Sequence, residues 1–214
     1  MINKTRIIYD EKFKNANVTL SNTTDGNYAV QVWMNNEIEH LDDKTPFIAT
    51  PSLFRLDPGQ EQIVKIIRLP GGLPNDRESI FYFNAQEIPE ATKSNERNKL
   101  VMAIRTRIKL IYRPNGILTK SEKAPELLQW KKFNTQNSSI LQVSNTTPFY
   151  ITFLKMKWHN GNEISNIHDP LMLPPFSMKS YLLKDKTSNV KGFIDYEVIN
   201  DFGGITHYKN IKVI

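Results

Sequence analysis

The sequence predicts an all-β protein made of two tandem sandwich domains, one over residues 1–114 and one over residues 115–214. Strand-like runs recur along the whole chain, and clusters of turn-forming residues separate them. No window of about 12 residues or more keeps a helical period of 3.6 with capping residues, so we expect little helix. An immunoglobulin-like sandwich has roughly 100 residues and seven strands, so two of them fit the chain length.

The expected strands fall into two groups on either side of a break near residue 114. The first group has runs at residues 5–10, 16–22, 28–35, 51–56, 61–69, 79–88 and 100–112. The second group has runs at residues 127–133, 139–145, 149–158, 178–184, 193–199 and 206–214. Pro114 cannot donate a hydrogen bond to a strand ladder, and Asn115-Gly116 favours a tight turn, so we place the domain boundary here.

Composition excludes several classes of site. The chain has 28 Lys and Arg against 22 Asp and Glu, and its net charge of +6 suits a carboxylate-bearing partner without indicating nucleic acid. It has no Cys, which excludes disulfides, thiol catalysis and Cys-ligated metals. His40, His159, His168 and His207 lack metal-ligand spacing, and no nucleophile-elbow or phosphate-loop motif occurs. We therefore expect no metal, no cofactor and no enzyme activity.

The run at residues 100–112 is unusual because it would span about 43 Å, more than twice the usual strand length. Its even-numbered positions are mostly apolar throughout, whereas its odd-numbered positions change from Val101 and Ala103 to basic residues from Arg105 onward. The first half therefore presents two apolar rows. Either the second sheet of the same domain covers the extra row, or another protein chain adds a strand at this edge.

The first domain contains PSLFRLDPGQEQIVKIIRLPGGLPNDRESIFYFNAQEIP followed by LVMAIRTRIKLIYRP, with TRIIYD and IATPS before them. In these segments the sequence resembles the periplasmic pilus chaperones of the PapD-like family. The second domain matches more sparsely, through NTTPFYITF, MLPP and INDFGG. The resemblance implies two immunoglobulin-like sandwiches set at an angle with a cleft between them. No signal peptide precedes the strand-like Ile7-Ile8-Tyr9, so the residues alone predict either a cytoplasmic protein or a mature form with an added Met1. The resemblance implies a periplasmic protein and so favours the mature form.

A function follows from this resemblance. Members bind a pilus (fimbrial) subunit that lacks its last strand and lend their own strand to complete it, which is donor-strand complementation. They thereby prevent aggregation of the subunit and deliver it to an outer-membrane usher. Pilus subunits and the usher are thus the expected partners, and nucleic acid is not. An uncovered apolar edge also predicts self-association when no subunit is bound.

The resemblance assigns the subunit's C-terminal carboxylate to two anchors, Arg6 in TRIIY and Lys109 in IKLIYRP. A carboxylate accepts two short charge-assisted hydrogen bonds, which an Arg fork and a Lys ammonium can supply. Without the resemblance, each residue alone would be interpreted as a solvated surface charge.

The resemblance also assigns the donor strand to Leu100, Met102 and Ile104, which alternate and so share one face. Their side chains would fill the groove that the missing subunit strand leaves. Val101 and Ala103, on the opposite row, are then expected in the chaperone's own interior. The competing interpretation makes Leu100, Met102 and Ile104 ordinary core residues.

A third set implied by the resemblance is a charge network near the domain junction, formed by Glu78 in DRES, Arg113 in YRP and Asp201 in INDFGG. An Arg between two carboxylates would fix the angle between the domains more than it would add stability. Glu78 or Asp201 taken alone would be a turn carboxylate.

Two other functions stay open at this point. A structural fimbrial subunit would be shorter, would usually carry a Cys pair and would lack a strand. A nucleic-acid-binding or carbohydrate-binding sandwich would use Arg105 and Arg107, and would need aromatic residues interleaved on that basic face. The run at residues 100–112 supplies only Tyr112.

Overall fold

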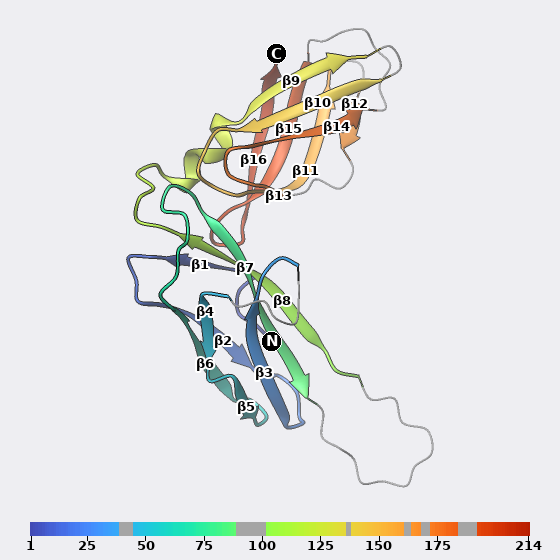
Figure 1. The fold of residues 1–214 in the computed structure, drawn as a ribbon. Helices are drawn as coiled ribbons and strands as arrows, with labels where there is room; N and C mark the ends of the chain where they lie inside the picture. The colour runs from blue at the N-terminus through green and yellow to red at the C-terminus, as the bar shows by residue number, and fades with distance from the viewer. Residues whose placement is uncertain (39–44, 89–101, 136–137, 161–163, 168–171, 184–191) are drawn as a thin grey trace. The chain divides into compact units, whose positions relative to one another are not determined.

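The computed structural model describes residues 1–38, 45–88, 102–135, 138–160, 164–167, 172–183 and 192–214 (Figure 1). The chain divides into two compact units. Unit 1 comprises Met1–Asn75 and Ser79–Asn115, and unit 2 comprises Asp76–Glu78 and Gly116–Ile214. The described residues contain no helix with the length and hydropathy of a membrane span.

Unit 1 is a sandwich of two sheets. Its strands are β1 (Arg6–Asp10), β2 (Asn15–Ser21), β3 (Tyr28–Asn35), β4 (Phe47–Thr50), β5 (Leu53–Leu56), β6 (Glu61–Arg68), β7 (Ser79–Ile88) and β8 (Arg105–Arg113). One sheet has the order β1-β8-β7-β3-β5, and the other has the order β2-β6-β4. Figure 1 draws these strands from blue through green.

The core of unit 1 lies between its two sheets, as the alternation in the sequence predicts. In β6, Val64 and Ile66 are fully buried and Lys65 between them is exposed. They belong to one apolar cluster with Phe83 of β7 and Leu110 of β8, both also fully buried. One row of side chains from each sheet therefore fills the interior.

The N-terminal segment changes from one sheet to the other. Ile2 forms an isolated bridge with Leu20 of β2, in the three-stranded sheet. A few residues later the chain enters the five-stranded sheet as β1, which runs parallel to the second half of β8 from Arg6 opposite Lys109 to Asp10 opposite Arg113. This crossing determines how much of β8 is covered by β1.

A polar cluster closes unit 1 at the end of β8. The carboxylate of Glu11 accepts the backbone N–H of Asn115 at 2.9 Å and forms an ion pair with Arg68, whose guanidinium lies 4.8 Å from the ring centre of Tyr112. The Asn115 amide, the Tyr112 hydroxyl and the Arg68 charge together lower the pKa of Glu11 below its usual 4.5. Glu11 therefore stays ionised and ties three segments together at neutral pH.

Unit 2 is a second sandwich. Its strands are β9 (Gln129–Asn134), β10 (Ser139–Asn145), β11 (Ile151–His159), β12 (Ile164–Ile167), β13 (Met172–Leu173), β14 (Ser177–Leu183), β15 (Gly192–Ile199) and β16 (Ile205–Val213). One sheet has the order β14-β10-β9 and the other β12-β11-β15-β16, with β13 also paired to β11. Leu141 of β10, Trp158 of β11 and Ile194 of β15 are fully buried in its core.

Gly192 marks the tightest packing in unit 2. A Cβ atom at this position would lie 2.8 Å from the carbonyl oxygen of His159 and 2.8 Å from the indole of Trp158. Because Trp158 is completely buried, neither neighbour can move away without disturbing the core. The close approach of β15 to β11 therefore requires glycine here.

The prediction of an all-β protein with little helix is confirmed. The described residues contain one short 3-10 helix, η1 (Ser121–Leu127), which ends just before β9. The predicted run at residues 79–88 coincides with β7. The long predicted run at residues 100–112 does not, because β8 begins only at Arg105, residues 102–104 are outside regular structure, and residues 100–101 lie outside the described residues.

Candidate functional site

The candidate site begins with the uneven pairing of β8. On one side β8 pairs with β7 along its length, from Arg105 opposite Gln86 to Tyr112 opposite Ser79. On the other side, the pairing with β1 starts only at Lys109. Among the described strands, none pairs with that side of β8 before Lys109. The first half of β8 is thus an open sheet edge, to which an extended segment can add.

The apolar row of β8 changes from buried to exposed along the strand. Ile108 and Leu110 are 8% and 0% exposed and belong to the core of unit 1. Ile104 and Met102, earlier in the same row, are 54% and 67% exposed. Leu100 lies outside the described residues. The second sheet of unit 1 therefore covers only the later half of this row, and two large apolar side chains remain uncovered in the earlier half.

The expectation for the opposite row is wrong where it can be examined. Ala103 is exposed rather than part of the interior of unit 1, and Val101 lies outside the described residues. Residues 102–104 are all exposed, so successive side chains on both sides of the chain are uncovered there. The backbone still follows β7, because the N–H of Glu87 donates to the carbonyl oxygen of Ile104 at 3.0 Å.

Arg6 and Lys109 meet where the open edge ends. They are register partners in the parallel pair of β1 and β8, so their side chains project from the same face of the sheet. Arg6 is buried and Lys109 is half-buried. Burial, followed by the charge of Arg6, lowers the pKa of the Lys109 ammonium. Two partly desolvated cations side by side form a suitable site for an anion with two oxygens, such as a carboxylate.

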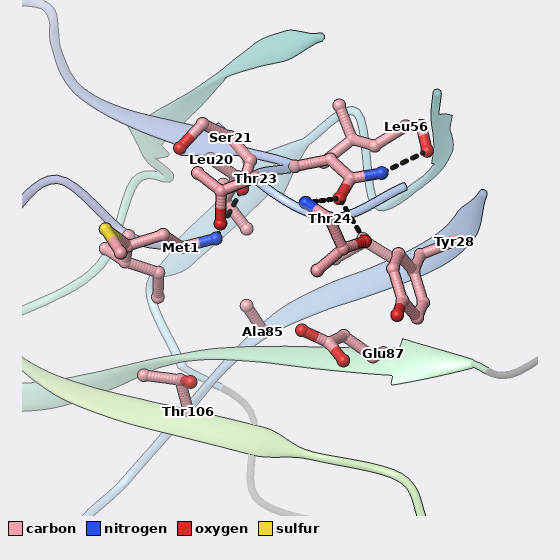
Figure 2. Close-up of a pocket in the computed structure, with 13 residues that line it drawn as sticks. Met1, Leu20, Ser21, Thr23, Thr24, Tyr28, Leu56, Ala85, Glu87 and Thr106 are labelled. Atoms are coloured by element: carbon pink, nitrogen blue, oxygen red, sulfur yellow. Dashed lines mark hydrogen bonds between the residues drawn. The ribbon is translucent and has the colours of Figure 1, made fainter. Parts of the chain in front are cut away.

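A cavity of about 320 Å³ lies beside the exposed row, within unit 1. Figure 2 shows Met1 and Leu20 on one side of it, with Ala85, Glu87 and Thr106 of the neighbouring strands β7 and β8 on the other. Thr106 follows Ile104 in the even row of β8. The cavity therefore reaches the even row of β8 at Thr106.

The outer face of β8 differs from the plain basic surface that the sequence suggested. The Arg105 guanidinium lies 4.8 Å from the ring centre of Trp33, and the Arg107 guanidinium lies 3.8 Å from that of Tyr82. Aromatic residues are therefore interleaved with the arginines, but they come from β3 and β7, and the guanidinium groups cover their faces. The guanidinium groups occupy the ring faces that would otherwise stack on a base or a sugar.

The members of the expected charge network lie in different units. Glu78 is 3% exposed in unit 2, where its carboxylate accepts the N–H of Tyr150 at 2.8 Å. Asp201, also in unit 2, accepts the hydroxyl of Ser121 at 2.9 Å. Arg113 belongs to unit 1, where its carbonyl oxygen accepts the N–H of Glu11 at 2.9 Å. A network joining the three residues stays a prediction.

No metal-binding cluster of His, Cys, Asp or Glu occurs in the part of the chain that the structure describes. His159 is 3.3 Å from Asp195, and His207 is 3.5 Å from Glu197, on the surface of unit 2. The other two histidines, His40 and His168, lie outside the described residues.

The roles of Trp33, Tyr82 and Asn84 were missed in the sequence. The alternation in β7 places Tyr82 and Asn84 on the outer face, which the sequence could have indicated. Their contacts with β8 depend on strand register, and Trp33 reaches the same place from two strands away, so no local pattern reveals the cluster.

Two family descriptions match the chain. Residues 1–118 match the PapD N-terminal domain of pili and flagellar-assembly chaperones, and residues 123–210 match the C-terminal domain of the pili assembly chaperone PapD. Together these two matches cover most of the sequence, in the order in which the two units occur.

Individual proteins are similar over nearly the whole chain. The probable fimbrial chaperone YadV of Escherichia coli K12 is 35% identical over 214 residues, which cover 95% of this chain and 86% of YadV. Its crystal structure has a TM-score of 0.81 with 98% of each chain covered. A chain in the complex of the Salmonella enterica SafA pilin with the SafB chaperone is 28% identical, with a TM-score of 0.80 over 98% of this chain and 95% of that one. The periplasmic chaperone SfaE is 29% identical, with a TM-score of 0.74 over 99% and 98%.

Proposed function

The chain belongs to the PapD family of pili and flagellar-assembly chaperones, and from this premise we propose that it captures pilus subunits by donor-strand complementation at the open edge of β8. The family is one of periplasmic chaperones rather than enzymes, so the periplasm is the compartment in which this capture takes place. The subunit is a pilin whose own sheet lacks its last strand.

The exposure of Met102 and Ile104 carries the proposal. They continue the row that Ile108 and Leu110 begin inside unit 1, but the facing sheet no longer covers them. When an incomplete pilin adds to the edge of β8, backbone hydrogen bonds provide general affinity and this alternating row fills the groove of the pilin. Leu100 is proposed as a further donor. Each side chain that becomes buried contributes roughly 1.5–3 kcal/mol before the cost of ordering is subtracted.

The anchor for the pilin's C-terminal carboxylate is proposed to be Arg6 together with Lys109. Their position supports this role, because the open edge ends at the register pair that they form. A strand added along the edge reaches these two cations with its terminus. Both groups are partly withdrawn from water, so an ion pair formed there is screened less than one at the surface. The anchor thereby fixes the register of the added strand.

Glu78, Arg113 and Asp201 are proposed to form a charge network that holds the two domains in the orientation needed for capture.

The bound pilin is then passed to an outer-membrane usher, where the next subunit replaces the chaperone strand. In the absence of a pilin, the uncovered edge of β8 is proposed to mediate self-association.

The test is co-expression of the whole chain in a bacterial periplasm with a pilin encoded beside it, followed by co-purification. We expect the wild-type chain to recover soluble pilin in equimolar amounts. Ile104→Glu should abolish recovery, and the same change at exposed Ile164 in unit 2 serves as the control. Equal recovery of pilin with the wild type and with Ile104→Glu would show that the pilin does not bind at the open edge of β8.

A further inference from the structure

Arg105 is held by a set of contacts that reach beneath the outer face of unit 1. Its Nε and Nη2 atoms donate to Oδ1 of Asn84 at 3.1 and 2.7 Å, while the guanidinium plane lies over the ring of Trp33. Asn84 is completely buried, and its Nδ2 donates to Oδ1 of Asn35 at 2.6 Å. The Arg105 guanidinium is therefore hydrogen-bonded to Asn84 on β7, which is itself hydrogen-bonded to Asn35 on β3. Both strands lie in the interior of the sheet.

Arg107 makes a second attachment two residues later in the same row. Its guanidinium lies 3.8 Å from the ring centre of Tyr82 on β7. Its Nη2 atom donates at 2.9 Å to the carbonyl oxygens of both Asn36 and Glu37, immediately after β3. Because β7 lies between β8 and β3 in the sheet, the side chains of both arginines cross β7 and contact β3 or the residues that follow it.

These attachments occur on the half of β8 that lacks a second partner strand. From Lys109 onward, β8 is held between β1 and β7. Before Lys109 the strand pairs with β7 alone, and Met102 and Ile104, which precede it in the even row, are more than half exposed and add little packing. A strand held on a single side opens locally at low cost in free energy. Arg105 and Arg107 lie where this cost would otherwise be lowest.

We propose that Arg105 and Arg107 are positioning residues that keep the open half of β8 extended and fix its outer row against Trp33 and Tyr82, so that the even row is presented to the client in a single orientation. This inference rests on the proposed function. Holding the strand in its binding conformation beforehand reduces the entropy lost on capture. The rigid fork of arginine is needed for the pair of bonds to Asn84, and lysine cannot supply it.

The experiment compares Arg105→Ala, Arg105→Lys and the control Arg55→Ala, which removes the same charge from β5 in the same sheet. Residue-resolved amide hydrogen exchange is measured by NMR on each protein without a client. We expect exchange at Thr106 and Ile108 to rise about tenfold in both Arg105 variants, because both lose the pair of charged hydrogen bonds to Asn84. Exchange at Leu110, which lies between β1 and β7, should stay unchanged.

The second measurement is the dissociation constant for the pilin encoded beside this chain. We expect it to rise about tenfold in both Arg105 variants and to stay unchanged in Arg55→Ala. If Arg105→Lys binds like the wild type, the charge attracts the client and the positioning role is wrong. A rise in exchange at Leu110 as large as that at Thr106 would indicate general destabilisation and also overturn it. If the wild type itself fails to bind the pilin, the proposed function is lost, whereas the ordering of β8 is still decided by exchange in the protein alone.

Discussion

Two isoleucines, one just before β8 and one within it, allow the core interpretation and the donor interpretation to be separated. Ile104 and Ile108 lie four residues apart, and they are 54% and 8% exposed. Replacing each with alanine removes the same atoms. For buried Ile108 the expected loss of unfolding free energy is about 2–5 kcal/mol, since the substitution leaves a cavity. For Ile104 the expected loss is within about 0.5 kcal/mol, as at other exposed positions.

The effect on client capture should have the opposite order. If Ile104 becomes buried in a pilin, its truncation removes about 1.5–3 kcal/mol of contact, which corresponds to roughly 10-fold to 150-fold weaker binding. The assays are urea unfolding followed by circular dichroism, and titration of a pilin that lacks its last strand. Capture by Ile108→Ala is measured well below its unfolding midpoint and should stay near that of the wild type. An unfolding loss at Ile104 comparable to that at Ile108 would return Ile104 to the core and refute the reasoning.

The other predictions concern the anchors, one carboxylate and one glycine. Arg6→Ala or Lys109→Ala should leave the unfolding free energy nearly unchanged and abolish pilin capture, whereas loss of the fold in either variant would contradict an anchor role. Capture by the wild type should also decline as the pH rises through the lowered pKa of Lys109, because the ammonium then loses its charge. Because the pKa of Glu11 is lowered in the folded protein, its carboxylate adds stability above pH 4.5, and this stability is lost as the pH falls through the folded-state pKa. Urea unfolding should therefore show Glu11→Gln less stable than the wild type at neutral pH, with a difference that shrinks as the pH falls below 4.5. Gly192→Ala should destabilise unit 2 by about 1–3 kcal/mol while the exchange of amides in unit 1 stays unchanged, and full retention of stability would show that Trp158 can move.

The sequence predicted most where burial alternates along a strand. In the run at residues 79–88, Phe81, Phe83 and Ala85 occupy alternate positions and are buried, and β7 has the bounds of that run. The same rule showed that the first half of the long run carries two apolar rows, whereas the assignment of Met102 and Ile104 to the donor row came from the family resemblance. It overestimated the strand itself, because apolar residues before Arg105 look alike whether they pair within the sheet or extend beyond it. Only the strand pairing and the exposure of these residues in the structure distinguish the two cases.

Other features depend on contacts between distant segments. Arg105 and Arg107 looked like a solvated basic row, because the rings beneath them come from β3 and β7. The pairing of Arg6 with Lys109 joins residues about 100 positions apart, and family resemblance rather than any local pattern indicated it. The contribution of each residue to pilin binding is still a prediction.

Residues 1–5 cross from one sheet to the other, and this route leaves the first half of β8 without a second partner strand. Had this segment continued beside β8 in the direction set by β1, it would have occupied the positions opposite residues 104–108 and closed the sandwich completely. The result would be an inert domain with an unchanged interior. The edge of β8 is thus left open by the route of one short terminal segment, and redirecting that segment along β8 is expected to block the proposed pilin site without changing any residue of β8.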